Sequence, residues 1–203
     1  MKILVACEYS GTVRDAFIRR GHDAMSCDIL PTDQPGPHYQ GNVLDVLGDG
    51  WDMVIAHPPC TYLCVSGLHW NKRRPGRAAL TDQAEAFFME FTRLGCKWAI
   101  ENPVGCMSTR YRKPDQYIQP YQFGNDASKK TGLWLNAVPN LVPTGYVRPR
   151  IVDGKKRWGN QADDGQNRDT TTGKVLAWGS DEIKTLRNKT YQGIADAMAE
   201  QWG

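Results

Sequence analysis

The sequence predicts an α/β protein built on a doubly wound sheet, and the first 28 residues carry the main observation. A short apolar run at residues 3–6 leads through a tight turn into a segment with helical spacing. A second apolar run follows at residues 24–28 and ends in an acid, Asp28. Strand, tight turn, helix, strand and terminal acid make up the nucleotide-binding half of a doubly wound sheet. Later apolar runs at residues 52–57 and 98–101 supply further strands.

Composition sets the frame for this fold. With 203 residues and 40% hydrophobic content, the chain can form one domain with a sizeable core and a small appendage. The apolar run near the start is too short for a signal peptide or a membrane span, so we expect a cytoplasmic protein with no membrane partner. Six cysteines without an even framework indicate free thiols in a reducing compartment. The net charge of +3 does not by itself identify a partner.

The first helix and the loops around it follow from spacing and turn residues. We expect this helix to end at Gly21, and its apolar face consists of Val13, Ala16, Phe17 and Ile18. Residues 30–41 are rich in proline, glycine and polar side chains, which indicates a loop. The short apolar stretch at residues 43–47 is expected to add the third element of the sheet.

A second helix crosses over between the later strands. Thr81 is expected to cap it, and Gly95 to end it. Its apolar face consists of Ala84, Phe87, Phe88, Phe91 and Leu94. Beyond the strand that contains Glu101, an irregular segment at residues 111–124 precedes a strand at residues 133–135.

Cys60 follows a buried strand directly. Pro58 and Pro59 stop the strand because neither offers an amide hydrogen. The thiol is therefore presented at the carboxyl end of a strand, which is where ligands and chemistry collect in open α/β sheets. A cysteine in this position is a candidate nucleophile.

An acid and an amide, Glu101 and Asn102, end the next strand and are followed by Pro103. A carboxyl group beside a thiol suits a reaction in which sulfur attacks a ring while a neighbouring ring nitrogen is protonated or hydrogen-bonded. The sequence therefore predicts a thiol and a carboxyl group at one edge of the sheet.

With these motifs the chain resembles the DNA cytosine-5 methyltransferases. The order is the same: a nucleotide-binding strand and loop at residues 6–11, then Pro59 and Cys60, then Glu101, Asn102 and Pro103. The resemblance covers about residues 1–140 and the last 15 or so. It implies a Rossmann-like fold that depends on S-adenosyl-L-methionine and a partner, DNA, whose target base is flipped out. The small size suits a phage or mobile-element enzyme.

The resemblance also implies roles for the catalytic residues Cys60, Glu101 and Asn102. The thiolate of Cys60 adds to carbon 6 of cytosine, so that carbon 5 becomes nucleophilic enough to take a methyl group. Glu101 hydrogen-bonds ring nitrogen 3 and the amino group. The carbon 5 proton then leaves and the thiolate is expelled, and no metal is needed.

The implied cofactor site lies on the first two strands and their loops. Asp28 would hold the ribose and Asn42 would meet the adenine amino group. The loop departs from the family because Glu8 and Ser10 stand where glycines are usual and only Gly11 remains. The full set of expected cofactor residues is Glu8, Tyr9, Ser10, Gly11, Thr12, Asp28, Ile29, Asn42 and Pro58.

The strongest signal for nucleic acid follows Cys60, where four cations stand within six residues beside Trp70. In the family this loop closes over DNA, and an arginine before the seventh strand helps to hold the flipped cytosine. The nearest equivalents of that arginine here are two lysines. The expected nucleic-acid-binding residues are Ser66, Lys72, Arg73, Arg74, Arg77, Lys129 and Lys130.

Residues 139–186 change in character and favour a small target-recognition insertion. Apolar spacing largely vanishes there, and basic residues gather around Trp158. A catalytic and cofactor-binding domain at residues 1–138 precedes this insertion, and a C-terminal helix within residues 187–203 returns to that domain. We expect a monomer that reads about two to four base pairs, because a small surface makes few base contacts.

Four other interpretations stay open from the residues. An RNA cytosine-5 methyltransferase would carry the same motifs, and a catalytically inactive nucleic-acid-binding relative would explain the altered cofactor loop. Methyltransferases that act on amino groups follow the two prolines with an aromatic residue, where this chain has Cys60. A zinc module on His57, Cys60 and Cys64 lacks a fourth ligand.

Overall fold

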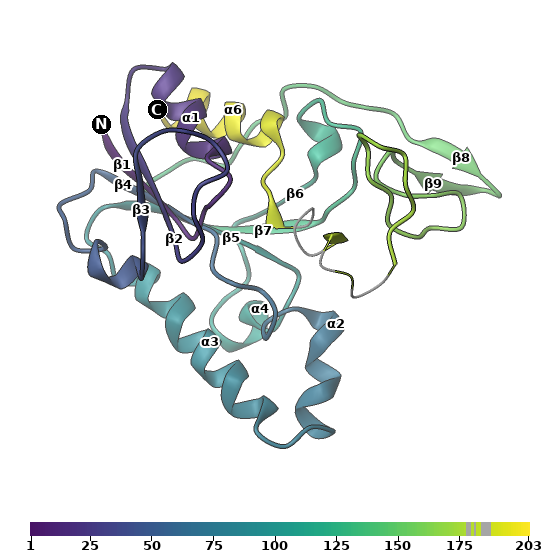
Figure 1. Ribbon diagram of the computed structural model, residues 1–203, viewed down its shortest axis with the longest axis horizontal. Coiled ribbons are helices and arrows are strands. Elements are labelled where there is room, and N and C mark those ends of the chain that lie inside the picture. The colour runs from purple at the N-terminus through teal and green to yellow at the C-terminus, as the bar shows by residue number, and fades with distance from the viewer. Residues whose placement is uncertain (178–179, 181, 184–187) are drawn as a thin grey trace.

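The computed structural model describes residues 1–177, 180, 182–183 and 188–203, and a mostly parallel sheet forms its centre (Figure 1). In this described part the main sheet has seven strands in the order β3-β2-β1-β4-β5-β7-β6. Strands β1 to β5 run parallel, and β7 is antiparallel to both of its neighbours. The strands are β1 (Lys2–Ala6), β2 (Asp23–Asp28), β3 (His38–Gln40), β4 (Met53–Ala56), β5 (Lys97–Pro103), β6 (Gln116–Ile118) and β7 (Thr131–Asn136). The predicted α/β class is confirmed, and the order of the first five strands is compatible with a Rossmann-like sheet.

Strands β1 and β4 lie side by side near the middle of the sheet, and each buries both of its faces. In β1, Ile3 and Val5 pack on one side while Leu4 and Ala6 pack on the other. This alternation follows from the two-residue repeat of a strand, and burial on both faces is typical of parallel sheets. Helices α1 (Thr12–Arg19) and α6 (Gln192–Trp202) cover the first face, and α3 (Arg77–Thr92) covers the second (Figure 1).

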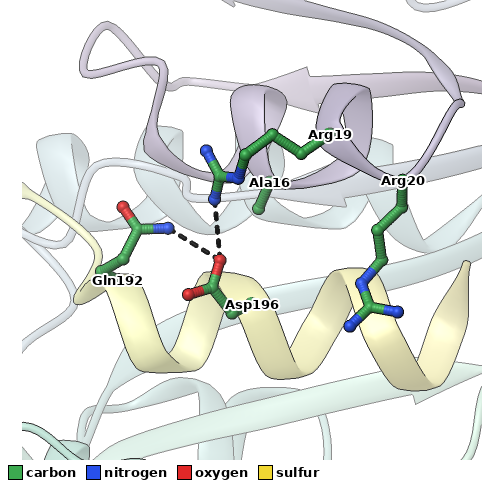
Figure 2. A pocket seen from close by; sticks show the side chains of 5 residues that line it. All are labelled: Ala16, Arg19, Arg20, Gln192 and Asp196. Atoms are coloured by element: carbon green, nitrogen blue, oxygen red, sulfur yellow. Dashed lines mark hydrogen bonds and ion pairs between the residues drawn. The ribbon is translucent and has the colours of Figure 1, made fainter.

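Helix α6 packs against α1 and beside the first strand. Ile194, Met198 and Trp202 share one hydrophobic cluster with Ile3 and Val5. Figure 2 shows the shallow pocket between the two helices, where the carboxylate of Asp196 accepts hydrogen bonds from Arg19 and Gln192, both at 2.8 Å. The C-terminal helix therefore completes the core of the sheet domain.

Two predictions about the region between β2 and β4 are wrong. Residues 30–41 are not entirely a loop, because β3 lies within them and pairs with β2. The buried guanidinium of Arg14 holds this segment by donating to the carbonyls of Gln34 and Pro35 at 3.1 and 3.3 Å. The stretch at residues 43–47 is a 3₁₀ helix, Val43–Asp45, and adds no strand, since the side chain of Asn42 caps its first turn.

Helix α3 begins earlier than the spacing of its apolar residues predicts. Gly76 precedes its first turn with φ of 74°, a left-handed conformation that glycine adopts at little cost. Thr81 is therefore inside the helix, fully buried, and its hydroxyl donates to the carbonyl of Tyr62 at 3.1 Å. The segment expected to be irregular at residues 111–124 contains β6.

The loop after Cys60 forms a projecting arm. It consists of α2 (Val65–Leu68), the 3₁₀ helix His69–Lys72 and the turn into α3. In Figure 1 the arm extends away from the sheet, and α3 begins at its far end. A short helix, α4 (Met107–Arg110), follows β5, and a 3₁₀ helix, Pro120–Gln122, follows β6.

A hairpin of β8 (Arg150–Val152) and β9 (Lys155–Arg157) projects in a different direction from the arm, at the right of Figure 1. Its base is tied to the sheet domain, because the ring of Trp158 stacks on Tyr121 at 4.4 Å between centroids. Leu141 packs in the main core, so the chain joins that core again before the hairpin. The boundaries at residues 138 and 186 stay predictions, and the second lies outside the described residues.

Across the described ranges, the structure contains no helix that combines the length and the apolar character needed to cross a membrane.

Candidate active site

A cavity of about 860 Å³ opens at the carboxyl ends of the parallel strands. Part of its lining comes from the carboxyl ends of β2 and β5 and from the chain that follows β1, β2 and β4. The strand order reverses between β1 and β4, and doubly wound sheets bind ligands in the crevice at such a reversal. The cavity is within the range of size that small-molecule sites have.

Cys60 lines this cavity, and its thiol is held neutral in the free protein. The backbone amides of Leu63 and Cys64 both donate to the carbonyl of Cys60, at 3.0 and 2.9 Å, so a tight turn fixes its position. A hydrogen bond to the Cys64 thiol raises the pKa of Cys60 far above its ordinary value, and burial and the charge of Glu101 act in the same direction.

Glu101 lines the same cavity, since β4 and β5 are neighbours. Burial opposes its ionisation, but Lys129, a hydrogen bond and charge from His57 and a hydrogen bond from Thr131 together lower its pKa to about 2. The carboxyl group is thus ionised at neutral pH and acts only as a hydrogen-bond acceptor.

His57 contacts Glu101 directly, a contact that the sequence analysis did not predict. Its Nδ1 lies 2.9 Å from Oε2 of Glu101, and its side chain is 9% exposed. Asn102 is buried, and its amide donates to the carbonyl of Pro58 at 2.8 Å, so it fixes the turn that carries Cys60. One feature of the sequence could have indicated that His57 lies at the site: it is the first residue after β4, at the carboxyl end of the strand.

Five of the predicted cofactor residues line the cavity: Tyr9, Asp28, Ile29, Asn42 and Pro58. Asp28 lies at the end of β2, and one of its carboxylate oxygens accepts from the amide of Leu30 at 2.9 Å. The side-chain oxygen of Asn42 accepts from the amide of Leu44 at 3.1 Å. Ile29 is 75% exposed and presents an apolar surface at the cavity.

The other four predicted cofactor residues, Glu8, Ser10, Gly11 and Thr12, do not line the cavity. The buried carboxylate of Glu8 accepts from the amides of Val13 and Arg14, at 2.7 and 3.2 Å, and so satisfies the first turn of α1. Gly11 has φ of 73°, and an added Cβ would lie 2.5 Å from the guanidinium of Arg14. These positions support the start of the helix.

The predicted nucleic-acid residues divide between the arm and the cavity. On the arm, the guanidinium of Arg74 lies 4.1 Å over the ring of Trp70, and that of Arg77 lies 4.3 Å over the ring of Tyr62. Lys72 and Arg73 are exposed. The cavity is lined by Ser66, Lys129 and Lys130.

The cavity also has polar lining residues that no motif predicted. They come from the loop before β7, from the chain after β9 and from the approach to α6, and they are Ser128, Asn160, Asn167, Asn188 and Tyr191. In the described ranges, no group of three or more His, Cys, Asp and Glu side chains is placed to hold a metal ion. The zinc interpretation thus has no ligand cluster in this part of the chain.

Comparison of the sequence with protein-family models and with curated proteins finds no match.

Proposed function

We propose that the protein is a DNA cytosine-5 methyltransferase that uses S-adenosyl-L-methionine. One observation carries the proposal: Cys60 and Glu101 line a single cavity at the ends of adjacent parallel strands, and Asp28 and Asn42 line the same cavity. A nucleophile, a carboxylate acceptor and polar groups suited to a nucleoside thus share one space. This arrangement supports the resemblance, because the motifs alone do not place these four side chains in one cavity.

The residues present fit S-adenosyl-L-methionine as the cofactor. Asp28 offers a carboxylate at the tip of β2, the place that takes ribose hydroxyls in doubly wound sheets. Exposed Ile29 and Leu30 line the cavity beside it and suit the face of a purine. The cofactor has no phosphates, so it does not require a glycine-rich cradle. When bound, it supplies an electrophilic methyl group on a sulfonium.

Cys60 and Glu101 have different roles in the reaction of cytosine. The thiol of Cys60 loses its proton to water and the thiolate forms a bond to carbon 6, while the ionised carboxylate of Glu101 accepts a hydrogen bond from the amino group. Electron density then reaches carbon 5, which takes the methyl group. Loss of the carbon 5 proton expels the sulfur, so the thiolate and the double bond are both restored.

Ionisation of Cys60 has to accompany assembly of the complex. Its thiol donates to Cys64 in the free protein, and burial and the charge of Glu101 raise its pKa as well. A cationic cofactor in the same cavity would lower this pKa, because a nearby positive charge favours the thiolate. The enzyme would therefore be unreactive as a free thiol and active with both substrates bound.

DNA would contact the protein on two sides of the cavity. The arm with Lys72, Arg73, Arg74 and Arg77 supplies cations and stacked aromatic rings. The hairpin β8–β9 supplies Arg150, Lys155 and Lys156, and a two-stranded ribbon fits the major groove of B-DNA. A target base leaves the stack before its carbon 6 can meet Cys60.

The test is incubation with methyl-labelled S-adenosyl-L-methionine and unmethylated duplex DNA, followed by digestion to nucleosides. We expect label in 5-methyldeoxycytidine, its loss in Cys60→Ala, and its retention in Cys96→Ala, a matched cysteine change between α3 and β5. If no DNA or RNA substrate is labelled but the protein still binds DNA, the inactive nucleic-acid-binding relative replaces the proposal.

A further inference from the structure

Three buried side-chain atoms have no hydrogen-bond partner among the residues that the structure describes: Nε2 of His57, Oδ1 of Asn102 and Nε of Arg77. The first two belong to residues that line the cavity beside Glu101. Buried polar groups almost always have a partner, so an unpaired one that lines a cavity requires an explanation, and a hydrogen-bonding group of a ligand would supply one. Arg77 is different, since it already donates to Thr61 and stacks on Tyr62.

The contact with Glu101 determines which ring nitrogen of His57 carries a proton. An ionised carboxylate can only accept, so Nδ1 of His57 must be the donor in the 2.9 Å contact. The inference concerns the neutral form of His57, and in that form Nε2 is an acceptor once Nδ1 carries the proton. The carboxylate of Glu101, Nε2 of His57 and Oδ1 of Asn102 thus form a cluster of acceptors, and a ligand edge that meets it must donate hydrogens.

We propose that His57 is a specificity residue for the target base, whose Nε2 accepts a hydrogen from the amino group on carbon 4 of cytosine. The inference rests on the proposed function and names the group that this site selects. The amino group of cytosine carries two hydrogens, one on the side of nitrogen 3 and one on the side of carbon 5, so one acceptor, Glu101, leaves one hydrogen for a second. Thymine and uracil present a carbonyl oxygen there, which would face the lone pair of Nε2.

His57 also holds Glu101 in place, and a variant can separate the two roles. His57→Asn keeps an amide donor near the position of Nδ1 and removes Nε2. His57→Gln does the opposite, since its amide oxygen reaches the position of Nε2. Both variants are first compared with the wild type by thermal unfolding, so that a folding defect is recognised.

The test measures the rate of covalent complex formation in the presence of S-adenosyl-L-methionine, by denaturing gel electrophoresis. Two DNA duplexes differ only at the target, which is 5-fluorocytosine in one and 5-fluoro-2-pyrimidinone in the other. The second base lacks the amino group but leaves carbon 6 open to the thiolate. We expect His57→Asn to react at least about tenfold more slowly than wild type with 5-fluorocytosine and within about twofold of wild type with 5-fluoro-2-pyrimidinone. His57→Gln should recover part of the difference between the two bases.

Equal losses on the two duplexes would overturn the inference, since they would mean that His57 only supports Glu101 or the fold. A wild-type protein that forms no complex with either duplex would instead contradict the proposed function. If His57→Asn does not fold, the ratio of the two rates in His57→Gln decides: the inference requires that this ratio stay closer to wild type than in His57→Ala.

Discussion

The thiol of Cys64 lowers the reactivity of the neighbouring thiol of Cys60. The hydrogen bond to Cys64 is the largest of the causes that raise the pKa of Cys60. Cys64→Ala removes it, and we expect iodoacetamide to modify Cys60 about three- to tenfold faster at pH 8, because the thiolate fraction rises tenfold per pKa unit. Peptide mass spectrometry resolves the site of modification. An unchanged rate, equal to that of Cys96→Ala, would remove Cys64 from this role.

Glu101 makes the stability of the fold depend on pH. Folding lowers the pKa of Glu101 from 4.5 to about 2, so its carboxylate stabilises the fold fully above pH 4.5. This stabilisation is lost as the pH falls from 4.5 to about 2. Urea unfolding should show that the loss of unfolding free energy between pH 5 and pH 3 is about 2 kcal/mol smaller in Glu101→Gln than in wild type. Glu200→Gln, on the surface of α6, is the control. Equal losses in wild type and Glu101→Gln would mean that Glu101 has an ordinary pKa.

Single residues of the candidate site differ in how well the sequence predicts them. Cys60 directly follows two prolines and Glu101 stands two residues before Pro103, each at the end of an apolar run, so their positions follow from local rules. The contacts of His57 and Thr131 with Glu101 join different strands, and their pairing depends on how those strands align. Glu8 was expected at the cofactor, and its carboxylate instead satisfies backbone amides of α1.

At the scale of the element, Glu8 determines how α1 begins. Its carboxylate accepts from two amides of the first turn, and an anion there also meets the positive end of the helix dipole. Glu8→Ala should lower the unfolding free energy by about 1–2 kcal/mol, measured by urea denaturation. Glu90→Ala, which breaks only a surface ion pair on α3, should change it by less than about 0.5 kcal/mol. The capping role would be wrong if the two variants behaved alike.

The arm after Cys60 is the element that we expect to contact phosphates. Replacing both Lys72 and Arg73 by alanine should weaken DNA binding equally across sequences and make the slope of log K against log salt shallower by about 1–2. Fluorescence anisotropy at several salt concentrations measures this slope. The double variant Arg19→Ala/Arg20→Ala changes charges on the α1–α6 surface and serves as the control. An arm variant with the wild-type slope would place DNA elsewhere.

Elements with strong local signals are predicted well. β1, α1, β2, β4 and β5 all lie where apolar runs and turn residues put them. β3 and β6 have only three residues each, and they form because long-range partners hold them. Arg14 supplies that partner for the segment of β3, and an arginine inside an amphipathic helix gives no sign of being buried.

At the scale of the whole molecule, the arm and the β8–β9 hairpin extend beyond the sheet (Figure 1). The cavity lies at the carboxyl ends of the parallel strands. The sequence predicts that a recognition segment follows the catalytic part, but its shape depends on contacts such as the stacking of Trp158 on Tyr121. The basic residues in the sequence predict a positive charge, but tertiary contacts determine where on the molecule that charge lies.

The central claim, a covalent bond between Cys60 and carbon 6 of cytosine, is tested most directly by mass spectrometry. The protein is incubated with S-adenosyl-L-methionine and duplex DNA that carries 5-fluorocytosine, which blocks release because carbon 5 has no proton to lose. The account predicts a complex with the mass of protein plus DNA plus one methyl group, with the linkage mapped to Cys60 itself by fragmentation of the peptide that contains Cys60 and Cys64. Absence of the complex across DNA sequences, or a linkage to Cys64 instead, would contradict it.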